Sequence, residues 1–165
     1  MSDGLTENEV IEGVKNYLRF SKGRSTNRNI LSKADANKKE HGVDLALKLS
    51  NDKGRGNYYY IEAKGNLKVE DSKSVEKKSD FMTEFRWAIS QIVLRIKTAS
   101  NKNNRIYGIA IPRSEKERCV NLIKDNWALR DLGVRLYCAY KEKDGELTAE
   151  ELVPSQIYTE VKGKK

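Results

Sequence analysis

Two charged residues stand two positions apart in the stretch YYYIEAKG, residues 58–65, which has the composition of a β-strand. Alternation along a strand places Glu62 and Lys64 on one face, together with Tyr58 and Tyr60. A carboxylate and an ammonium group on an interior strand are costly to bury unless they pair, bind a metal or face a cleft. Because the chain has a single histidine, carboxylates would have to hold any metal, and such ligands favour Mg2+ or Mn2+.

A third charged residue belongs to the neighbouring strand. The stretch HGVDLALKLS, residues 41–50, predicts a strand with Asp44 at its entrance, and the glycines and asparagines of residues 51–57 suit a hairpin turn. A turn near Gly54 brings Asp44 across from about residue 64. Two simpler readings stay open: an Asx turn at the start of a strand for Asp44, and a surface ion pair for the two charges of the second strand.

An amphipathic helix predicted over residues 6–20 supplies a fourth charged group. Thr6 and Glu9 form a capping box that fixes where the helix begins. At 100° per residue, Glu7 lies on the apolar side and turns toward the sheet, whereas Glu9 turns away. We therefore choose Glu7 as the acid of this helix, with Glu9 as the alternative.

The remaining pattern predicts a mixed sheet covered on both faces, because nearly continuous apolar strands alternate with helices. The sequence predicts a single domain over residues 1–165, with a core over about 6–140 and an edge element and basic tail over 141–165. The further elements that we expect are a short strand at 29–34, a helix at 76–98, a strand at 105–112, a helix at 114–131, a strand at 134–140 and the edge element near 147–154.

The helix predicted over 76–98 has a buried stripe and a polar flank. The stripe runs through Phe81, Phe85, Ala88, Ile89, Ile92, Val93 and Ile96. The flank contains Gln91 and Arg95, and a solvated surface explains the arginine equally well. Trp87 lies outside the buried stripe, at a position that could belong to a subunit interface. We expect Trp127 to lie in the core.

Composition limits the class of protein. The formal charge of +8 is compatible with a polyanionic partner. Cys119 and Cys138 lie far apart in apolar stretches, which favours reduced thiols in the core of an intracellular protein. The first residues lack the apolar segment of a secretion signal, so we expect a cytoplasmic protein.

The residues G-V-D (42–44) and I-E-A-K (61–64), on two paired strands between a glutamate-bearing helix and a long helix, resemble the PD-(D/E)xK nuclease superfamily. Val43 stands where many members have proline. The resemblance implies a restriction endonuclease-like α/β fold, with elements in the order α-β-β-α-β-α-β. It also implies a Mg2+-dependent (or Mn2+-dependent) endonuclease that hydrolyses phosphodiester bonds, most simply of DNA.

The resemblance also implies roles for individual residues. Asp44, Glu62, the carbonyl of Ala63 and Glu7 would hold metal, and Lys64 would orient the attacking water. Gln91 resembles a glutamine that many small members carry near the site, and small enzymes of this kind often act as homodimers.

Basic side chains on segments 22–40 and 102–105 and on the first hairpin strand are candidates for binding phosphates, although a solvated surface explains them equally well. These candidates are Arg24, Arg28, Lys38, Lys39, Lys48, Lys102 and Arg105. His41 is expected to be an ordinary loop residue. The alternative functions are a non-catalytic nucleic-acid-binding module and a subunit of a defence or mobile-element complex that keeps the fold.

Overall fold

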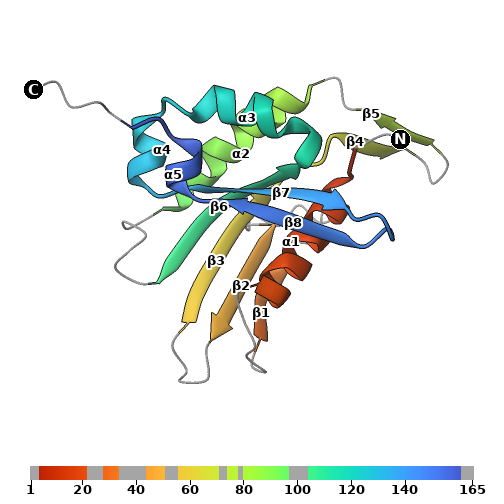
Figure 1. Cartoon of the computed structure of the whole chain (residues 1–165), viewed down its shortest axis with the longest axis horizontal. Helices are drawn as coiled ribbons and strands as arrows, with labels where there is room; N and C mark the ends of the chain where they lie inside the picture. The colour runs from red at the N-terminus through yellow and green to blue at the C-terminus, as the bar shows by residue number, and fades with distance from the viewer. Residues whose placement is uncertain are drawn as a thin grey trace, which may run out of the picture.

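The computed structural model describes residues 4–21, 28–33, 44–50, 56–70, 74–77, 80–96 and 104–160. Its main feature is a six-stranded sheet in the order β1-β2-β3-β6-β7-β8 (Figure 1). The outer pairs β1–β2, β2–β3 and β7–β8 are antiparallel, and the central pairs β3–β6 and β6–β7 are parallel, so the sheet is mixed. The strands are β1 (Arg28–Lys33), β2 (Leu45–Ser50), β3 (Gly56–Ala63), β6 (Arg105–Pro112), β7 (Arg135–Lys141) and β8 (Leu147–Leu152).

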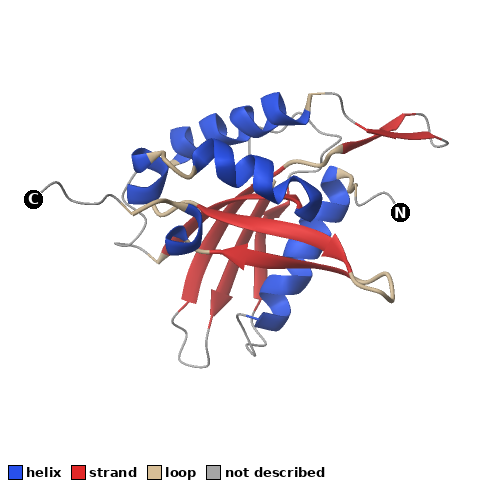
Figure 2. Ribbon diagram, turned by 45° about the horizontal axis from the view of Figure 1, so that its top comes forward, coloured by secondary structure: helices blue, strands red, loops and turns tan. Residues whose placement is uncertain are grey.

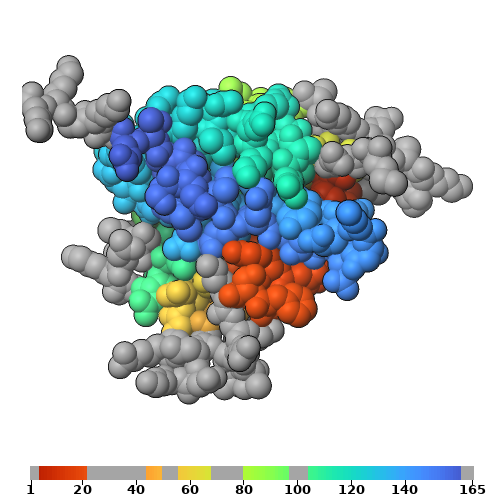
Figure 3. Space-filling model, viewed as in Figure 1, coloured from red at the N-terminus to blue at the C-terminus, as the bar shows by residue number. Residues whose placement is uncertain are grey.

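Helices cover both faces of this sheet, as the α/β pattern predicts (Figures 1 and 2). One face carries α1 (Glu7–Ser21), and Figure 3 shows its surface directly beside that of the β7–β8 pair. The other face carries α2, α3, α4 and α5. Their bounds are α2 (Phe81–Arg95), α3 (Lys116–Ile123), α4 (Trp127–Asp131) and α5 (Pro154–Ile157), with a 3-10 turn η1 (Arg113–Glu115) before α3.

Two apolar cores lie against the two faces, and the alternation along β2 and β3 decides which residue enters which core. Leu45, Leu47 and Ile61 pack with the inner side of α1. Ala46 and Tyr60 face the core beneath α2. The predicted faces of the hairpin are therefore confirmed, and Asp44 and Glu62 fall on the α2 side.

The stretch before α2 differs from the prediction. It forms a small separate hairpin of β4 (Leu67–Glu70) and β5 (Ser74–Lys77), which stands apart from the main sheet (Figure 2). The helix consequently begins at Phe81 rather than near residue 76. Val93, expected in the buried stripe, is 40% exposed, and the stripe is narrower than predicted.

The helix predicted over 114–131 is interrupted. The first part, α3, ends at Ile123, and Asn126 caps the start of α4, because its side-chain oxygen accepts a hydrogen bond from the Leu129 N–H at 3.0 Å. The prediction that Trp127 lies in the core is wrong, since its side chain is 68% exposed. Trp87 is also largely exposed, as its place off the stripe predicts.

The two cysteine thiols are buried and unpaired, as expected for core residues. Burial raises the pKa of Cys138 to about 12, which keeps this thiol protonated at neutral pH. Among the described residues, no helix is both long enough and apolar enough to cross a bilayer.

Candidate functional site

The register of the β2–β3 hairpin brings Asp44 and Glu62 together. Leu45 pairs with Ile61 and Lys48 pairs with Tyr58, so the same register extended by one residue sets Asp44 opposite Glu62. The prediction that Asp44 lies opposite residue 64 is therefore off by two positions. Residues directly opposite in an antiparallel pair point to the same face, which places both carboxylates on one side of the sheet.

Asp44 is held at the strand end by the main chain of its neighbour. The Ala63 N–H donates a hydrogen bond to Asp44 Oδ2 at 2.7 Å. A carboxylate that accepts an amide hydrogen bond is both stabilised and fixed in direction. The backbone N–H of Ala63 therefore lies beside the carboxylate of Asp44 and fixes its position at the strand end.

Glu62 is a buried charge, with 1% of its surface exposed. Its Oε1 forms an ion pair with Nη1 of Arg95, in the last turn of α2. Burial lowers the pKa of the Arg95 guanidinium, and the negative charge of Asp44 opposes that shift in part. Because arginine stays protonated in proteins, one guanidinium offsets charge on both carboxylates.

Lys64 lies between two acids at the same end of the hairpin. Its Nζ is 3.6 Å from Oε2 of Glu7 and 3.9 Å from Oδ2 of Asp44. The structure thus brings Glu7, and not Glu9, to the predicted site. These three side chains are mostly shielded from solvent, with exposed fractions of 15% for Lys64, 25% for Glu7 and 16% for Asp44.

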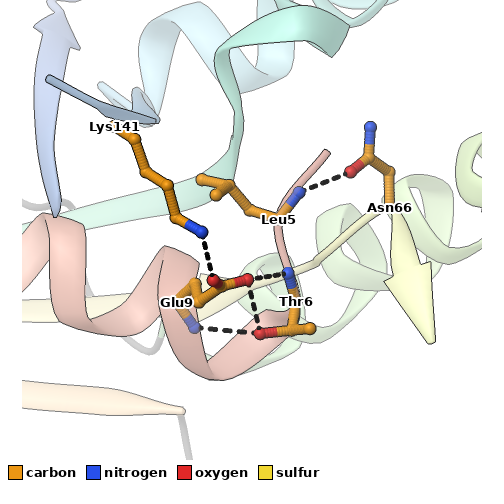
Figure 4. A network of polar contacts seen from close by, with 5 residues as sticks. All are labelled: Leu5, Thr6, Glu9, Asn66 and Lys141. Atoms are coloured by element: carbon orange, nitrogen blue, oxygen red, sulfur yellow. Dashed lines mark hydrogen bonds and ion pairs between the residues drawn. The ribbon is translucent and has the colours of Figure 1, made fainter. Parts of the chain in front are cut away.

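A polar network fixes the start of α1 (Figure 4). Glu7 is the first residue of this helix, so the network also fixes its position. The predicted capping box is confirmed: Thr6 N–H donates to Glu9 Oε2 at 2.8 Å, and Glu9 N–H donates to Thr6 Oγ1 at 3.3 Å. Lys141 contacts the other oxygen of Glu9 at 2.7 Å, and the Leu5 N–H donates to Asn66 Oδ1 at 2.9 Å. Burial raises the pKa of Glu9, but its bonds with Lys141 and Thr6 outweigh burial and lower it overall.

The chain that leaves β3 passes close to this helix start. A Cβ on Gly65 would lie 2.3 Å from the backbone nitrogen of Glu7, so only glycine fits between Lys64 and the helix. Asn66, 2% exposed, donates from Nδ2 to Ser114 Oγ at 3.2 Å and to Glu115 Oε1 at 3.1 Å. Asn66 therefore ties the end of β3 to both helical layers, a role that its place in a charged link did not reveal.

The predicted glutamine of α2 is not the residue of that helix that contacts Glu62. Gln91 is partly exposed and lies one turn before Arg95, on the same flank. The interpretation of this flank as solvated surface did not predict that Arg95 contacts Glu62. The available signal was a cation in the last helical turn, on the same side as the expected glutamine, in a helix that packs on the Glu62 face.

Two of the predicted phosphate-binding cations flank tyrosines on the Glu62 face of the sheet. Lys48 Nζ lies 5.4 Å from the ring centre of Tyr58, and Arg105 Cζ lies 5.9 Å from that of Tyr60. Tyr60 stacks on Tyr107 at 5.6 Å between ring centres. This row of cations and tyrosines begins two residues from Glu62 and continues toward the start of β3, where that strand extends away from α2 (Figure 1).

The other predicted cations cannot be placed in the same way. Arg28 begins β1, and its side chain is outside the described set. Residues outside the described ranges include Arg24, Lys38, Lys39, Lys102 and His41.

The oxygen ligands at the hairpin end are of the type that a hard divalent cation prefers. Within the described ranges, no group of three or more His, Cys, Asp or Glu side chains could hold a metal ion. The fitting set is smaller: the carboxylates of Asp44 and Glu62 on facing strands, with the backbone of Ala63 beside them. In the described structure, the cation that pairs with Glu62 is Arg95.

Comparisons with family models, with curated proteins and with solved structures found no match to this chain.

Proposed function

We propose that the protein is a metal-dependent nuclease of the PD-(D/E)xK type, which hydrolyses phosphodiester bonds. One observation carries the proposal. Asp44, Glu62 and Lys64 meet at one end of the β2–β3 hairpin, with Lys64 Nζ 3.9 Å from Asp44 Oδ2 and with Asp44 bonded to the Ala63 N–H. Three charged groups from two strands, largely shielded from water, are costly to assemble without a charged ligand or a reaction to serve.

The architecture supports a restriction endonuclease-like fold. An antiparallel hairpin is followed by two parallel strands, and helices cover both faces of the mixed sheet. The order α1, β2, β3, α2, β6, α3 and α4, β7 supports the proposal. The strands β1 and β8 correspond to the short strand expected at 29–34 and to the edge element expected near 147–154, whereas the β4–β5 hairpin and α5 were not expected.

The chain's own residues have distinct tasks in the proposed reaction. Asp44, Glu62 and the carbonyl of Ala63 would hold Mg2+ or Mn2+. Such an ion polarises a phosphate oxygen and lowers the pKa of bound water. Lys64 orients the attacking water and offsets negative charge on the phosphate. Glu7, to which the resemblance assigns a place among the metal ligands, contacts the Lys64 ammonium at 3.6 Å, and in the proposed reaction it keeps that group beside Asp44.

We propose DNA as the substrate and the Lys48–Arg105 row as part of its binding surface. The net charge of +8 and the cations beside Tyr58 and Tyr60 suit a polyanion that carries bases. We also propose a cytoplasmic homodimer. Its interface would use the outer side of α2, where Trp87 and Leu94 are exposed seven residues apart.

The second candidate is a nucleic-acid-binding module without catalysis. The Arg95–Glu62 ion pair favours it, since a carboxylate that already has a cationic partner does not require a metal. In that case the basic surface would bind nucleic acid while the hairpin end served only to stabilise the fold.

Cleavage of plasmid and linear DNA, single-stranded DNA and RNA would test the proposal, with Mg2+, Mn2+ or chelator. Wild type, Asp44→Asn and Lys64→Met would be compared with two controls at exposed positions, Asp80→Asn and Lys143→Met. We expect metal-dependent cleavage that falls at least about 100-fold in the two site variants and stays unchanged in the controls. Equal cleavage by all five proteins would indicate a contaminant, and tight binding without cleavage would establish the module.

A further inference from the structure

The ion pair between Glu62 and Arg95 joins the candidate site to the last turn of α2. Only 2% of the Glu62 side chain and 28% of the Arg95 side chain are exposed. Lys64, the other cation of the cluster, contacts Asp44 and Glu7 instead. Arg95 is therefore the cationic group that holds Glu62 in the described structure.

We infer that Arg95 is a resident counter-ion that a divalent cation must displace from Glu62, so that Arg95 sets how tightly the site binds metal. The inference rests on the proposed function, since it assumes that Asp44 and Glu62 share a metal ion. It adds a residue that the resemblance to nucleases does not supply.

Competition follows from where the charges lie. A metal ion shared by Asp44 and Glu62 would lie close to the Arg95 guanidinium. This group already contacts Glu62 and interacts electrostatically with Asp44. Two cations at such short range in a shielded site repel each other strongly. Because arginine does not lose its proton, Arg95 cannot release Glu62 by deprotonation, and a metal ion must take its place at the carboxylate.

The charge balance of the described cluster has the same consequence. Three carboxylates, of Glu7, Asp44 and Glu62, face the two cationic groups of Lys64 and Arg95, a net charge of −1. Replacing Arg95 by glutamine makes the net charge −2, which a divalent ion neutralises. The variant should therefore bind metal more tightly than the wild type, although most changes beside a metal site weaken binding.

Calorimetric titration with Mn2+ and with Ca2+, at fixed ionic strength and without DNA, measures this directly. The proteins would be the wild type, Arg95→Gln and the matched control Arg86→Gln, which removes the same charge from an exposed position of the same helix. We expect Arg95→Gln to bind Mn2+ at least about tenfold more tightly, a difference of about 1.4 kcal/mol, and Arg86→Gln to match the wild type.

Stability supplies a second readout that does not depend on catalysis. Removing Arg95 leaves Glu62 buried without its counter-ion, so Arg95→Gln should melt at a lower temperature than the wild type in chelator. Saturating Mn2+ should raise its melting temperature by more than it raises that of the wild type. If this variant does not fold, the wild type supplies the test: the NMR signal of its Arg95 Nε–H group should shift when Mg2+ is added.

The outcomes separate this inference from the proposed function. Equal or weaker Mn2+ binding by folded Arg95→Gln, or an Arg95 signal unmoved at saturating Mg2+, would overturn the inference and leave the metal site in place. Failure of both the wild type and Arg95→Gln to bind Mn2+ or Ca2+ would overturn the metal site itself.

Discussion

Substituting Asn66 by alanine removes a buried side chain that links three segments of the chain. Its Oδ1 accepts from the Leu5 N–H at 2.9 Å, across 61 residues of sequence. Its Nδ2 donates to Ser114 Oγ at 3.2 Å and to Glu115 Oε1 at 3.1 Å. The change leaves a buried amide without its acceptor and weakens the hold on the buried Glu115 carboxylate, which keeps Arg118 as a partner at 2.8 Å.

The expected cost follows from the three bonds. A hydrogen bond between neutral groups contributes about 1 kcal/mol, and one to a charged group contributes about 1.5 to 3 kcal/mol. Two neutral bonds and one charged bond therefore predict a loss of about 3.5 to 5 kcal/mol in the free energy of unfolding. Urea denaturation followed by circular dichroism would measure it as a lower midpoint at an unchanged slope.

Asn16→Ala is the matched control, because Asn16 makes one described side-chain bond, to the Leu147 carbonyl at 2.9 Å, from a partly buried position. Its loss should cost about 1 kcal/mol. If Asn66→Ala is no more destabilising than Asn16→Ala, then the network around Asn66 does not fix the start of α1, and the account of how Glu7 is positioned is wrong.

Two further predictions concern charge. Burial and the opposing bonds to Lys141 and Thr6 leave the pKa of Glu9 below its ordinary value of 4.5. Its stabilisation is therefore present above that value and is lost as the pH falls through the folded-state pKa. Glu9→Gln should be less stable than the wild type at pH 7, and the difference should shrink toward pH 3 in urea titrations; a constant difference would contradict it. In DNA binding assays over a range of salt concentrations, Lys48→Gln and Arg105→Gln should each weaken binding and reduce the salt slope by about 1, whereas unchanged slopes would place both side chains away from phosphate.

The sequence predicts which face of the hairpin is buried, because side chains alternate between the two faces of a strand and the large aliphatic residues all fall on one of them. Leu45, Leu47 and Ile61 all belong to one core, which fixes Asp44 and Glu62 on the opposite side. The register was harder to predict, because Gly56 and Asn57 join β3 and move the centre of the hairpin by one residue. A shift of one residue at the turn moves each cross-strand partner by two, which is why Asp44 faces Glu62 instead of Lys64.

Arg95 and Asn66 were not predictable in the same way. A helical wheel gives the angle of Arg95 around α2 but not the distance of the helix end from β3. Asn66 sits in a polar stretch that looks like a linker, and its partners Leu5 and Glu115 are remote in sequence. Short elements were also missed, since the four-residue strands β4 and β5 carry too few residues to show a period.

The charged cluster draws its side chains from both helical layers, and the two layers act on it in opposite senses. Local opening of α2 takes Arg95 away and leaves Glu62 as an uncompensated negative charge. Local opening of α1 takes Glu7 away and leaves Lys64 with Asp44 alone. Local opening of α2 therefore makes the net charge of the hairpin end more negative, and local opening of α1 makes it more positive. The net charge of the site thus depends on which of the two helices has opened.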